Sequence, residues 1–114
     1  MAFSSSGLNA AVNGLVAAGT FISFHTADPG TTGASEVSGS GYARQSSTFG
    51  AATNGVRVGS QVSTTIPAAT SITHWGLQSA ATAGTFLYGG TLPSAESFGQ
   101  AGTYAFTPTL SATN

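Results

Sequence analysis

The chain has 114 residues, and 4% of them are charged, whereas roughly 25% is usual in soluble domains. Two arginines without any lysine cannot neutralise a phosphate backbone, so nucleic-acid binding is excluded. The absence of cysteine excludes disulfides and cysteine-based zinc sites, and no apolar run approaches the ~18 residues of a membrane-spanning helix. No basic residue precedes the first apolar stretch, so no secretion signal is expected.

An amphipathic helix is predicted over residues 5–18. Apolar residues recur there at helical spacing and share one face: Leu8, Val12, Leu15 and Val16. Ser5 or Ser6 can cap the first free N–H groups, and Gly19 stands where a left-handed C-cap belongs. Because Gly14 weakens the helix interior, we expect the helix to depend on tertiary packing.

The chain after this helix has the residue pattern of β-strands. A β-branched and aromatic segment at residues 20–26 stops at the Asp-Pro-Gly turn signal of residues 28–30. Residues 56–66 alternate most clearly, and one face of that strand holds Val56, Val58, Ser60, Val62, Thr64 and Ile66. Three further strands are predicted, over 71–79, 85–92 and 102–110, with turns at 50–55, 81–84 and 93–102.

The spacing of these strands predicts the fold class. Short strands separated by glycine-rich turns indicate one all-β domain over residues 1–114, with a β-sandwich or jelly-roll-like fold over about 20–110 and one short N-terminal α-helix. Pro108 has no N–H to donate, so the last strand is an edge strand or carries a bulge. The Gly- and Ser-rich segment 30–41 is predicted to be a flexible loop.

Four ionisable side chains fall around this loop: His25, Asp28, Glu36 and Arg44. Asp28 can accept backbone N–H groups in an Asx turn. Arg44 can pair with Glu36 across the base of the loop, where an exposed pair contributes ~0–1 kcal/mol. If one of these residues instead meets a neighbouring subunit and is desolvated there, truncating it costs more. The sequence leaves these alternatives open, and it makes Asp28, Glu36 and Arg44 candidate interface or binding residues.

A catalytic or metal site would require His25 or His74 to meet a carboxylate such as Asp28 or Glu36. The two histidines lie about 50 residues apart, which is no recognised ligand spacing. No Gly-x-Ser-x-Gly elbow joins a strand to a helix, and with so many serines a chance combination is expected. We therefore expect no metal, no cofactor and no catalytic residue.

Aromatic rings can instead stack on sugar rings, and the chain offers Trp75, Tyr42, Tyr88 and Tyr104. Trp75 and Tyr104 alternate with polar neighbours in predicted strands, so we expect both in the core. Tyr42 follows the loop beside Arg44 and is expected to be the exposed ring. Tyr42 and Tyr88 are therefore the aromatic candidates for a binding surface.

Four motifs make the chain resemble a family of small virion proteins of tailed phages, from about residue 8 to residue 110. The motifs are HTADPG at 25–30, GASEV at 33–37, YAR at 42–44 and THWGLQSA at 73–80. Members of that family are labelled tail-fibre-like, minor tail or structural proteins, mostly of actinobacterial phages, and some accessory proteins of such phages decorate the capsid. Trp75 departs from the pattern, because a smaller or aliphatic residue is usual there.

The resemblance implies a non-enzymatic structural protein of a bacteriophage virion, displayed as a capsid decoration or as a tail-associated, fibre-like or minor tail module. Its partners would be major capsid or tail proteins and further copies of itself in a homo-oligomer. It would be assembled in the host cytoplasm and released by lysis. The family has no established catalytic residues to transfer. The alternative is a glycan- or receptor-binding module at the tail tip.

Overall fold

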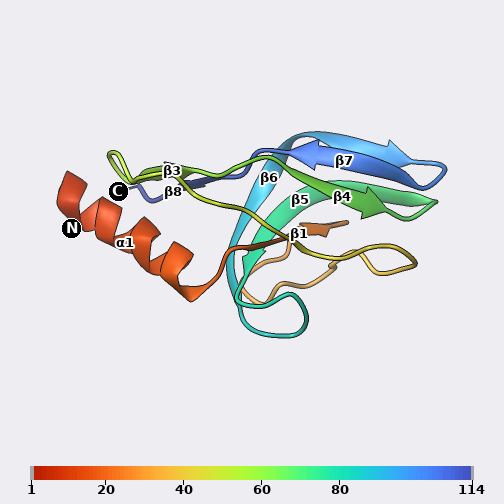
Figure 1. Ribbon diagram of the computed structural model, residues 1–114, viewed down its shortest axis with the longest axis horizontal. Coiled ribbons are helices and arrows are strands. Elements are labelled where there is room, and N and C mark those ends of the chain that lie inside the picture. Colours follow the sequence, from red (N-terminus) through yellow and green to blue (C-terminus); the bar gives the residue numbers. More distant parts are fainter. Residues whose placement is uncertain (1, 114) are drawn as a thin grey trace.

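The computed structural model describes residues 2–113, and within this range the chain forms one helix and eight strands (Figure 1). In chain order they are α1 (Ser5–Ala18), β1 (Phe21–His25), β2 (Gln45–Ser46), β3 (Val56–Val58), β4 (Val62–Ile66), β5 (Thr70–Gln78), β6 (Phe86–Phe98), β7 (Gly102–Phe106) and β8 (Thr109–Ser111). The predicted all-β class with one short N-terminal helix is therefore confirmed. No helix of the described chain has the length and hydropathy needed to cross a membrane.

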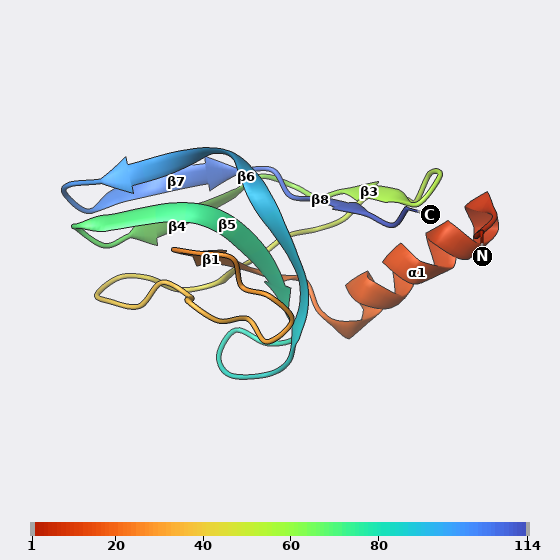
Figure 2. The ribbon, with the colours of Figure 1, turned by 180° about the vertical axis from the view of Figure 1, so that it is seen from behind.

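The strands form two layers that pack face to face (Figures 1 and 2). One layer is an antiparallel sheet with the strand order β2-β1-β5-β6. The other consists of two antiparallel ladders that follow one another along the same two chain segments, β4 with β7 and β3 with β8. The molecule is elongated, 45 × 24 × 23 Å, and α1 lies beside the β3–β8 ladder, where both ends of the described chain also lie (Figure 1).

Aromatic rings fill the space between the two layers. Phe24 of β1 packs edge-on against Tyr104 of β7, with 5.3 Å between the ring centroids. The ring centroids of Trp75 of β5 and Phe106 of β7 lie 5.4 Å apart. Trp75 is 4% exposed, so its predicted place in the core is confirmed, and Tyr104 is half-buried against the same cluster. These ring contacts join the four-stranded sheet to β7 and supply much of the buried apolar area of a small domain.

Strand β1 is buried on both of its faces, and this feature positions the site. Phe24 points into the aromatic core, so the alternating side chains of Ser23 and His25 point to the opposite face of the sheet. On that face the His25 ring packs against the ring of Phe86, and both Ser23 and His25 are 0% exposed. A polar pair is therefore enclosed behind the core sheet.

The predicted helix over residues 5–18 is confirmed with the same bounds, but both of its caps differ from the prediction. Ser4 is the N-cap, rather than one of the two serines that follow it, and its Oγ accepts a hydrogen bond from the Gly7 N–H at 3.1 Å. Gly19 is extended, with a φ of 179°, and is not a left-handed cap. Glycine is needed there for another reason, because a Cβ would collide with the carbonyl oxygen of Gln78.

The prediction of a single strand over residues 56–66 is wrong, because the strand is interrupted at Gly59 and divides into β3 and β4. This glycine lies so close to Pro108 that a side chain would collide with the proline ring. Across the break, the registers of the β3–β8 and β4–β7 ladders differ by one residue. The shift turns Val58 outward, where it is 52% exposed, although the alternation placed it on the core face. The strand predicted over 102–110 divides at the same level into β7 and β8.

Strand β6 covers most of the segment 93–102, which the sequence predicted to be a turn. The register between β5 and β6 shifts between Ile72 and His74, which marks a bulge. Pro93 lies on β6 at this bulge, a position that tolerates a residue without an N–H. The turn itself is reduced to residues 99–101.

Candidate functional site

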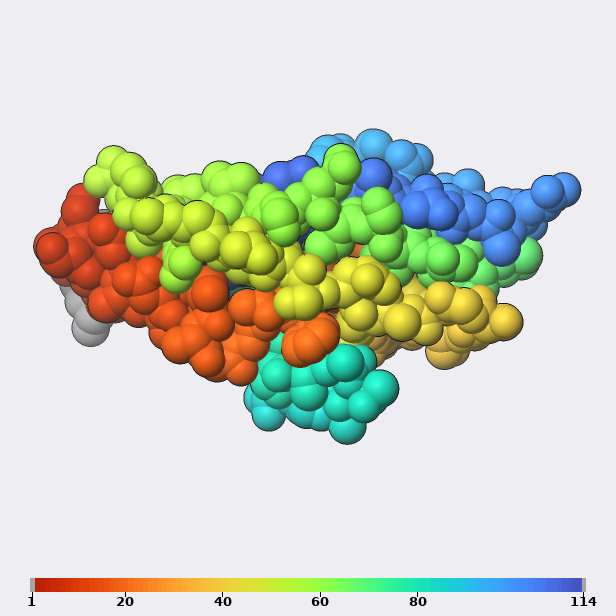
Figure 3. All heavy atoms as spheres, viewed as in Figure 1, coloured from red at the N-terminus to blue at the C-terminus, as the bar shows by residue number. Residues whose placement is uncertain are grey.

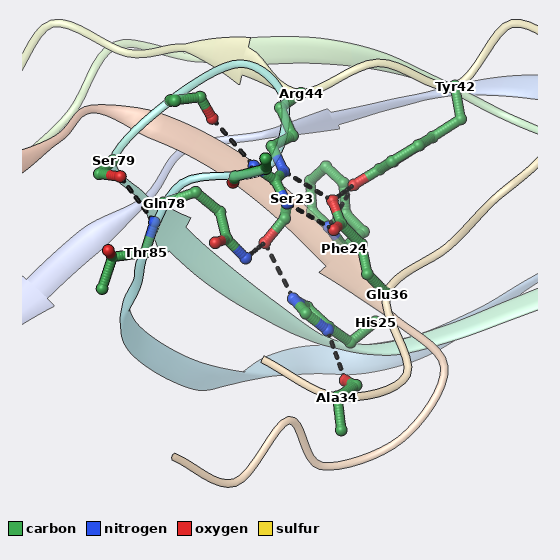
Figure 4. A network of polar contacts seen from close by, with 12 residues as sticks. Ser23, Phe24, His25, Ala34, Glu36, Tyr42, Arg44, Gln78, Ser79 and Thr85 are labelled. Atoms are coloured by element: carbon green, nitrogen blue, oxygen red, sulfur yellow. Dashed lines mark hydrogen bonds and ion pairs between the residues drawn. The ribbon is translucent and has the colours of Figure 1, made fainter. Parts of the chain in front are cut away.

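The polar side chains of the segment between β1 and β2 meet at the carboxylate of Glu36 (Figure 4). Arg44 donates to it twice, from Nε to Oε2 at 2.8 Å and from Nη2 to Oε1 at 2.7 Å. Its Nη1 donates to the carbonyl oxygens of Ala80 at 2.9 Å and Ala83 at 2.8 Å. The ion pair expected between Arg44 and Glu36 is present, and the same guanidinium also ties the β5–β6 loop to this segment.

Tyr42 approaches the same carboxylate from another side (Figure 4). Its hydroxyl donates to Glu36 Oε2 at 2.8 Å and accepts the backbone N–H of Phe24 at 3.1 Å. The ring is half-buried against the core, so the prediction of an exposed Tyr42 ring is wrong. Burial raises the pKa of the Tyr42 hydroxyl, which therefore stays protonated and keeps its donor role. We call Glu36, Tyr42 and Arg44, with the Ala80 and Ala83 carbonyls, the Arg44 cluster.

Glu36 is ionised within this cluster although it is partly removed from water. Burial by itself raises the pKa of the Glu36 carboxyl, but the hydrogen bonds from Arg44 and Tyr42 and the positive charge of Arg44 act against burial and leave that pKa below its usual value. The hydrogen bond with Glu36 in turn raises the pKa of Arg44. The side chains of Arg44 and Glu36 are 11% and 23% exposed, so salt screens this pair less than it screens an exposed ion pair.

A second polar chain lies on the covered face of β1 (Figure 4). His25 Nδ1 lies 2.8 Å from the carbonyl oxygen of Ala34, which can only accept, so Nδ1 carries the proton. Nε2 of the neutral ring therefore accepts from the Ser23 hydroxyl at 2.8 Å, and Ser23 Oγ accepts from Gln78 Nε2 at 3.1 Å. Burial lowers the pKa of His25, in agreement with a neutral ring.

The two histidines that lie far apart in the sequence are neighbours across the sheet. His25 pairs with His74 in the register of β1 and β5. Both ring nitrogens of His25 are already hydrogen-bonded, and His74 Nδ1 lies 2.7 Å from the Thr73 hydroxyl. Among residues 2–113, no group of three or more histidine, cysteine or acidic side chains is placed to hold a metal ion.

The remaining two candidate residues lie apart from the Arg44 cluster. Asp28 is exposed and forms the expected Asx turn, with Oδ1 accepting the Gly30 N–H at 2.8 Å. Tyr88 of β6 packs against Trp75, with 5.5 Å between the ring centroids. Of the five candidate residues predicted from the sequence, the structure therefore brings three together and places one in a turn and one against the core.

Sequence reasoning does not find the partners that the cluster takes from other parts of the chain. Ala80 and Ala83 contribute backbone carbonyls, and because every residue has one, the sequence does not indicate which carbonyls act as acceptors. The link from Tyr42 to the Phe24 N–H depends on how the segment after β1 folds back over the sheet. The polar pair of β1 is the exception. Ser23 and His25 occupy alternating positions of a strand, and this spacing indicates that their side chains share a face.

A shallow groove opens beside the Arg44 cluster. It has a volume of about 370 Å³ and is bounded by residues 36–39 and 42–44 on one side and by residues 81–83 on the other. Figure 3 shows the β5–β6 loop projecting from the body of the molecule below the segment after β1. Since Arg44 holds the carbonyls of Ala80 and Ala83, the side chain that completes the cluster also sets the separation of the groove walls.

Comparison with known protein families gives a match over almost the full length of the chain. Residues 6–111 match the family described as Podophage GP4 fiber I protein gp80. No match was found among curated proteins. The family match supports the resemblance to virion proteins of tailed phages that the motifs suggested. Because the matched region includes both β layers and nearly all of α1, the chain belongs to this podophage fibre protein family.

Proposed function

We propose that this chain is a non-enzymatic structural module of a phage tail fibre. The observation that carries the proposal is the family match over residues 6–111. The module is assembled in the host cytoplasm, carried on the virion and released by lysis. Its partners are other virion proteins and further copies of itself.

The way the fold uses its few charges supports a position among closely packed neighbours. Glu36 and Arg44 bind each other, and Arg57 donates to acceptors of the same chain. Outside these contacts the charged side chains are the acidic groups of Asp28 and Glu96. A surface made largely of Ser, Thr, Gly and Ala carries little charge, so identical chains repel one another only weakly when they approach.

The burial of the Ser23–His25 pair supports a non-enzymatic role. This pair resembles a catalytic dyad in its 2.8 Å contact, but both side chains are 0% exposed. His25 Nδ1 is bonded to the Ala34 carbonyl and not to the carboxylate that orients histidine in a catalytic triad. A substrate could reach the Ser23 hydroxyl only after the covering loops had opened.

Head and tail locations predict different copy numbers, and this difference tests the proposal. A fibre module is expected at few copies per particle, whereas a capsid decoration follows the symmetric lattice of the major capsid protein. We would measure the molar ratio of this chain to the major capsid protein by quantitative mass spectrometry of purified virions, with host proteins as the contamination baseline. A low ratio well above that baseline is expected. A ratio near that of the capsid lattice indicates decoration, and absence from virions contradicts a virion role.

Immunogold electron microscopy with antibodies against the chain supplies the location. Gold particles on fibres are expected, and gold on heads would overturn the fibre assignment. A glycan-binding role for the same module is favoured by one specific feature, the groove beside the Arg44 cluster.

A further inference from the structure

The groove beside the Arg44 cluster retains polar groups after the internal contacts are made. An arginine side chain has five N–H donors, and the contacts to Glu36, Ala80 and Ala83 use four of those of Arg44. One N–H of Nη2 remains. Glu36 Oε2 accepts two hydrogen bonds, whereas Oε1 accepts one and keeps a lone pair. A donor and an acceptor therefore lie next to each other along the groove.

The walls of the groove add small hydroxyl and methyl groups. Ser38 on one wall and Thr82 on the other are exposed. Methyl groups of Ala43, Ala81 and Ala83 also line the groove. The groove thus offers polar and apolar contacts in the same small space, and its volume of about 370 Å³ lies in the range of ~300–1,000 Å³ typical of small-molecule sites.

The charges of the groove disfavour ionic ligands. Glu36 and Arg44 neutralise each other, so the pair attracts neither anions nor cations strongly. A phosphate bonded to the unused Nη2–H of Arg44 would lie beside the Glu36 carboxylate, which repels it. A two-point contact with Arg44 would require the phosphate to displace Glu36 from one of the strong hydrogen-bonded arrangements in proteins. Tyr42 offers a planar aromatic ligand only part of its ring for stacking, because the ring is half-buried. A neutral sugar fits these conditions, because its hydroxyls both donate and accept and its C–H face packs on methyl groups.

We infer that this groove binds a neutral saccharide unit, whose hydroxyls bond to Glu36 Oε1 and to the unused Nη2–H of Arg44. The C–H face of the sugar lies against the methyl groups of the β5–β6 loop. This inference rests on the proposed function, because a module on the outside of a virion meets the saccharides of cell surfaces.

Titration of the ¹⁵N-labelled full chain tests the ligand class. The probes are glucose, galactose, mannose and N-acetylglucosamine, with glucuronic acid and glucosamine as charged counterparts. Neutral sugars are expected to shift the amide resonances of residues 36–44 and 81–83, and the charged sugars to shift them less. The inference is overturned if the neutral sugars cause no shifts at the highest soluble concentration, if the shifts lie elsewhere, or if a charged sugar binds more tightly.

Two variants that fill the groove test the location. Thr82→Trp and Ser38→Trp each place a ring in the groove from one wall, without replacing a member of the Arg44 cluster. Each is expected to weaken binding about tenfold or more. Thr103→Trp makes a matched change on an exposed position of β7 and should bind like the wild type. Thermal unfolding confirms that each variant is folded, and unchanged binding by both groove variants would refute the location.

The saccharide inference and the fibre proposal can fail separately. Fibre labelling by antibody together with a blank titration removes the saccharide inference and leaves the fibre proposal intact. Sugar binding in the groove by a chain that is absent from purified virions refutes the fibre proposal.

Discussion

The two arginines of this chain hold different regions together, and they do so with different acceptors. Arg44 meets a carboxylate and two backbone carbonyls in the Arg44 cluster. Arg57 of β3 meets neutral groups alone: it donates to the carbonyls of Gly50 at 2.6 Å and Phe49 at 3.0 Å, and to Asn13 Oδ1 of α1 at 3.1 Å. We call Arg57 and these three acceptors the Arg57 cluster.

The comparison shows how a charged acceptor changes the consequence of the same donor geometry. Hydrogen bonds between ionised groups are roughly twice as strong as neutral ones, and removing one partner of a shielded pair leaves the other charge without compensation. Two of the three neutral acceptors of Arg57 belong to the exposed residues Asn13 and Gly50, and these can hydrogen-bond to water when the arginine is removed. We therefore expect the Arg44 cluster to support the stability of the whole fold, and the Arg57 cluster mainly to hold α1 against β3.

The largest effect is expected for Arg44→Ala. The substitution leaves the partly buried Glu36 carboxylate unpaired and frees the Ala80 and Ala83 carbonyls. The free energy of unfolding should therefore fall by about 3 kcal/mol. This value is at the lower end of the range for buried ion pairs, because the Arg44–Glu36 pair is partly exposed. Denaturant unfolding measures the loss, and hydrogen exchange should become faster in residues 79–85. A loss below about 1 kcal/mol would mean that the pair behaves like an exposed one.

A smaller loss, of about 2 kcal/mol, is expected for Glu36→Gln. The substitution gives the Arg44 cluster a neutral amide acceptor like that of Asn13 in the Arg57 cluster, and the glutamine NH₂ group also faces donors of Arg44 or Tyr42. Glu96→Gln makes the same chemical change on β6 and should alter stability by about 0.5 kcal/mol or less. Equal effects of the two substitutions would show that the charge of Glu36 is not special.

Arg57→Ala should cost about 1 kcal/mol, because its acceptors are neutral and both Asn13 and Gly50 are exposed to water. The amides of α1 should exchange faster, while those of the β1–β5 ladder keep their protection. Hydrogen exchange followed by mass spectrometry separates the two regions. Loss of protection in β1 with an unchanged α1 would reverse the roles assigned to the two clusters.

The smallest effect concerns pH. The pKa of Glu36 is lower in the folded chain than its usual 4.5, so its contribution to stability is complete above pH 4.5 and is lost as the pH falls through the folded value. The stability difference between the wild type and Glu36→Gln should therefore shrink in acid. The difference between the wild type and Arg57→Ala should stay constant, because no acceptor of Arg57 titrates. A parallel decrease of both differences would contradict the distinction between the clusters.

Local sequence patterns predicted the secondary structure best where an element packs against the rest of the fold through a single apolar face. The apolar stripe of residues 5–18 predicted α1 with its observed bounds. The alternation in residues 56–66 failed at Gly59, because the register there is set by the neighbouring chain around Pro108 and not by the strand itself. Val58 is therefore exposed although its spacing is that of a core residue.

The candidate site was also predicted only in part, because contacts between distant segments of the chain decide most of it. The segment after β1 contains both Glu36 and Arg44, and the sequence was enough to suggest that they pair. The burial of Tyr42, the carbonyls of Ala80 and Ala83 and the proximity of His25 to His74 were beyond sequence reasoning. Each depends on contacts between segments that are far apart in the chain, or on how a loop folds back over the sheet.

Residue types and their spacing were sufficient for the all-β class, for the position of the helix and for the Arg44–Glu36 pair. These features arise from short-range periodicity and from charges close together in the chain. The tertiary structure alone decided the break at Gly59, the groove beside the Arg44 cluster and the neutral state of His25. Those features require two segments to be brought to a defined distance, and backbone carbonyls, burial and register are properties of that arrangement and not of any single residue.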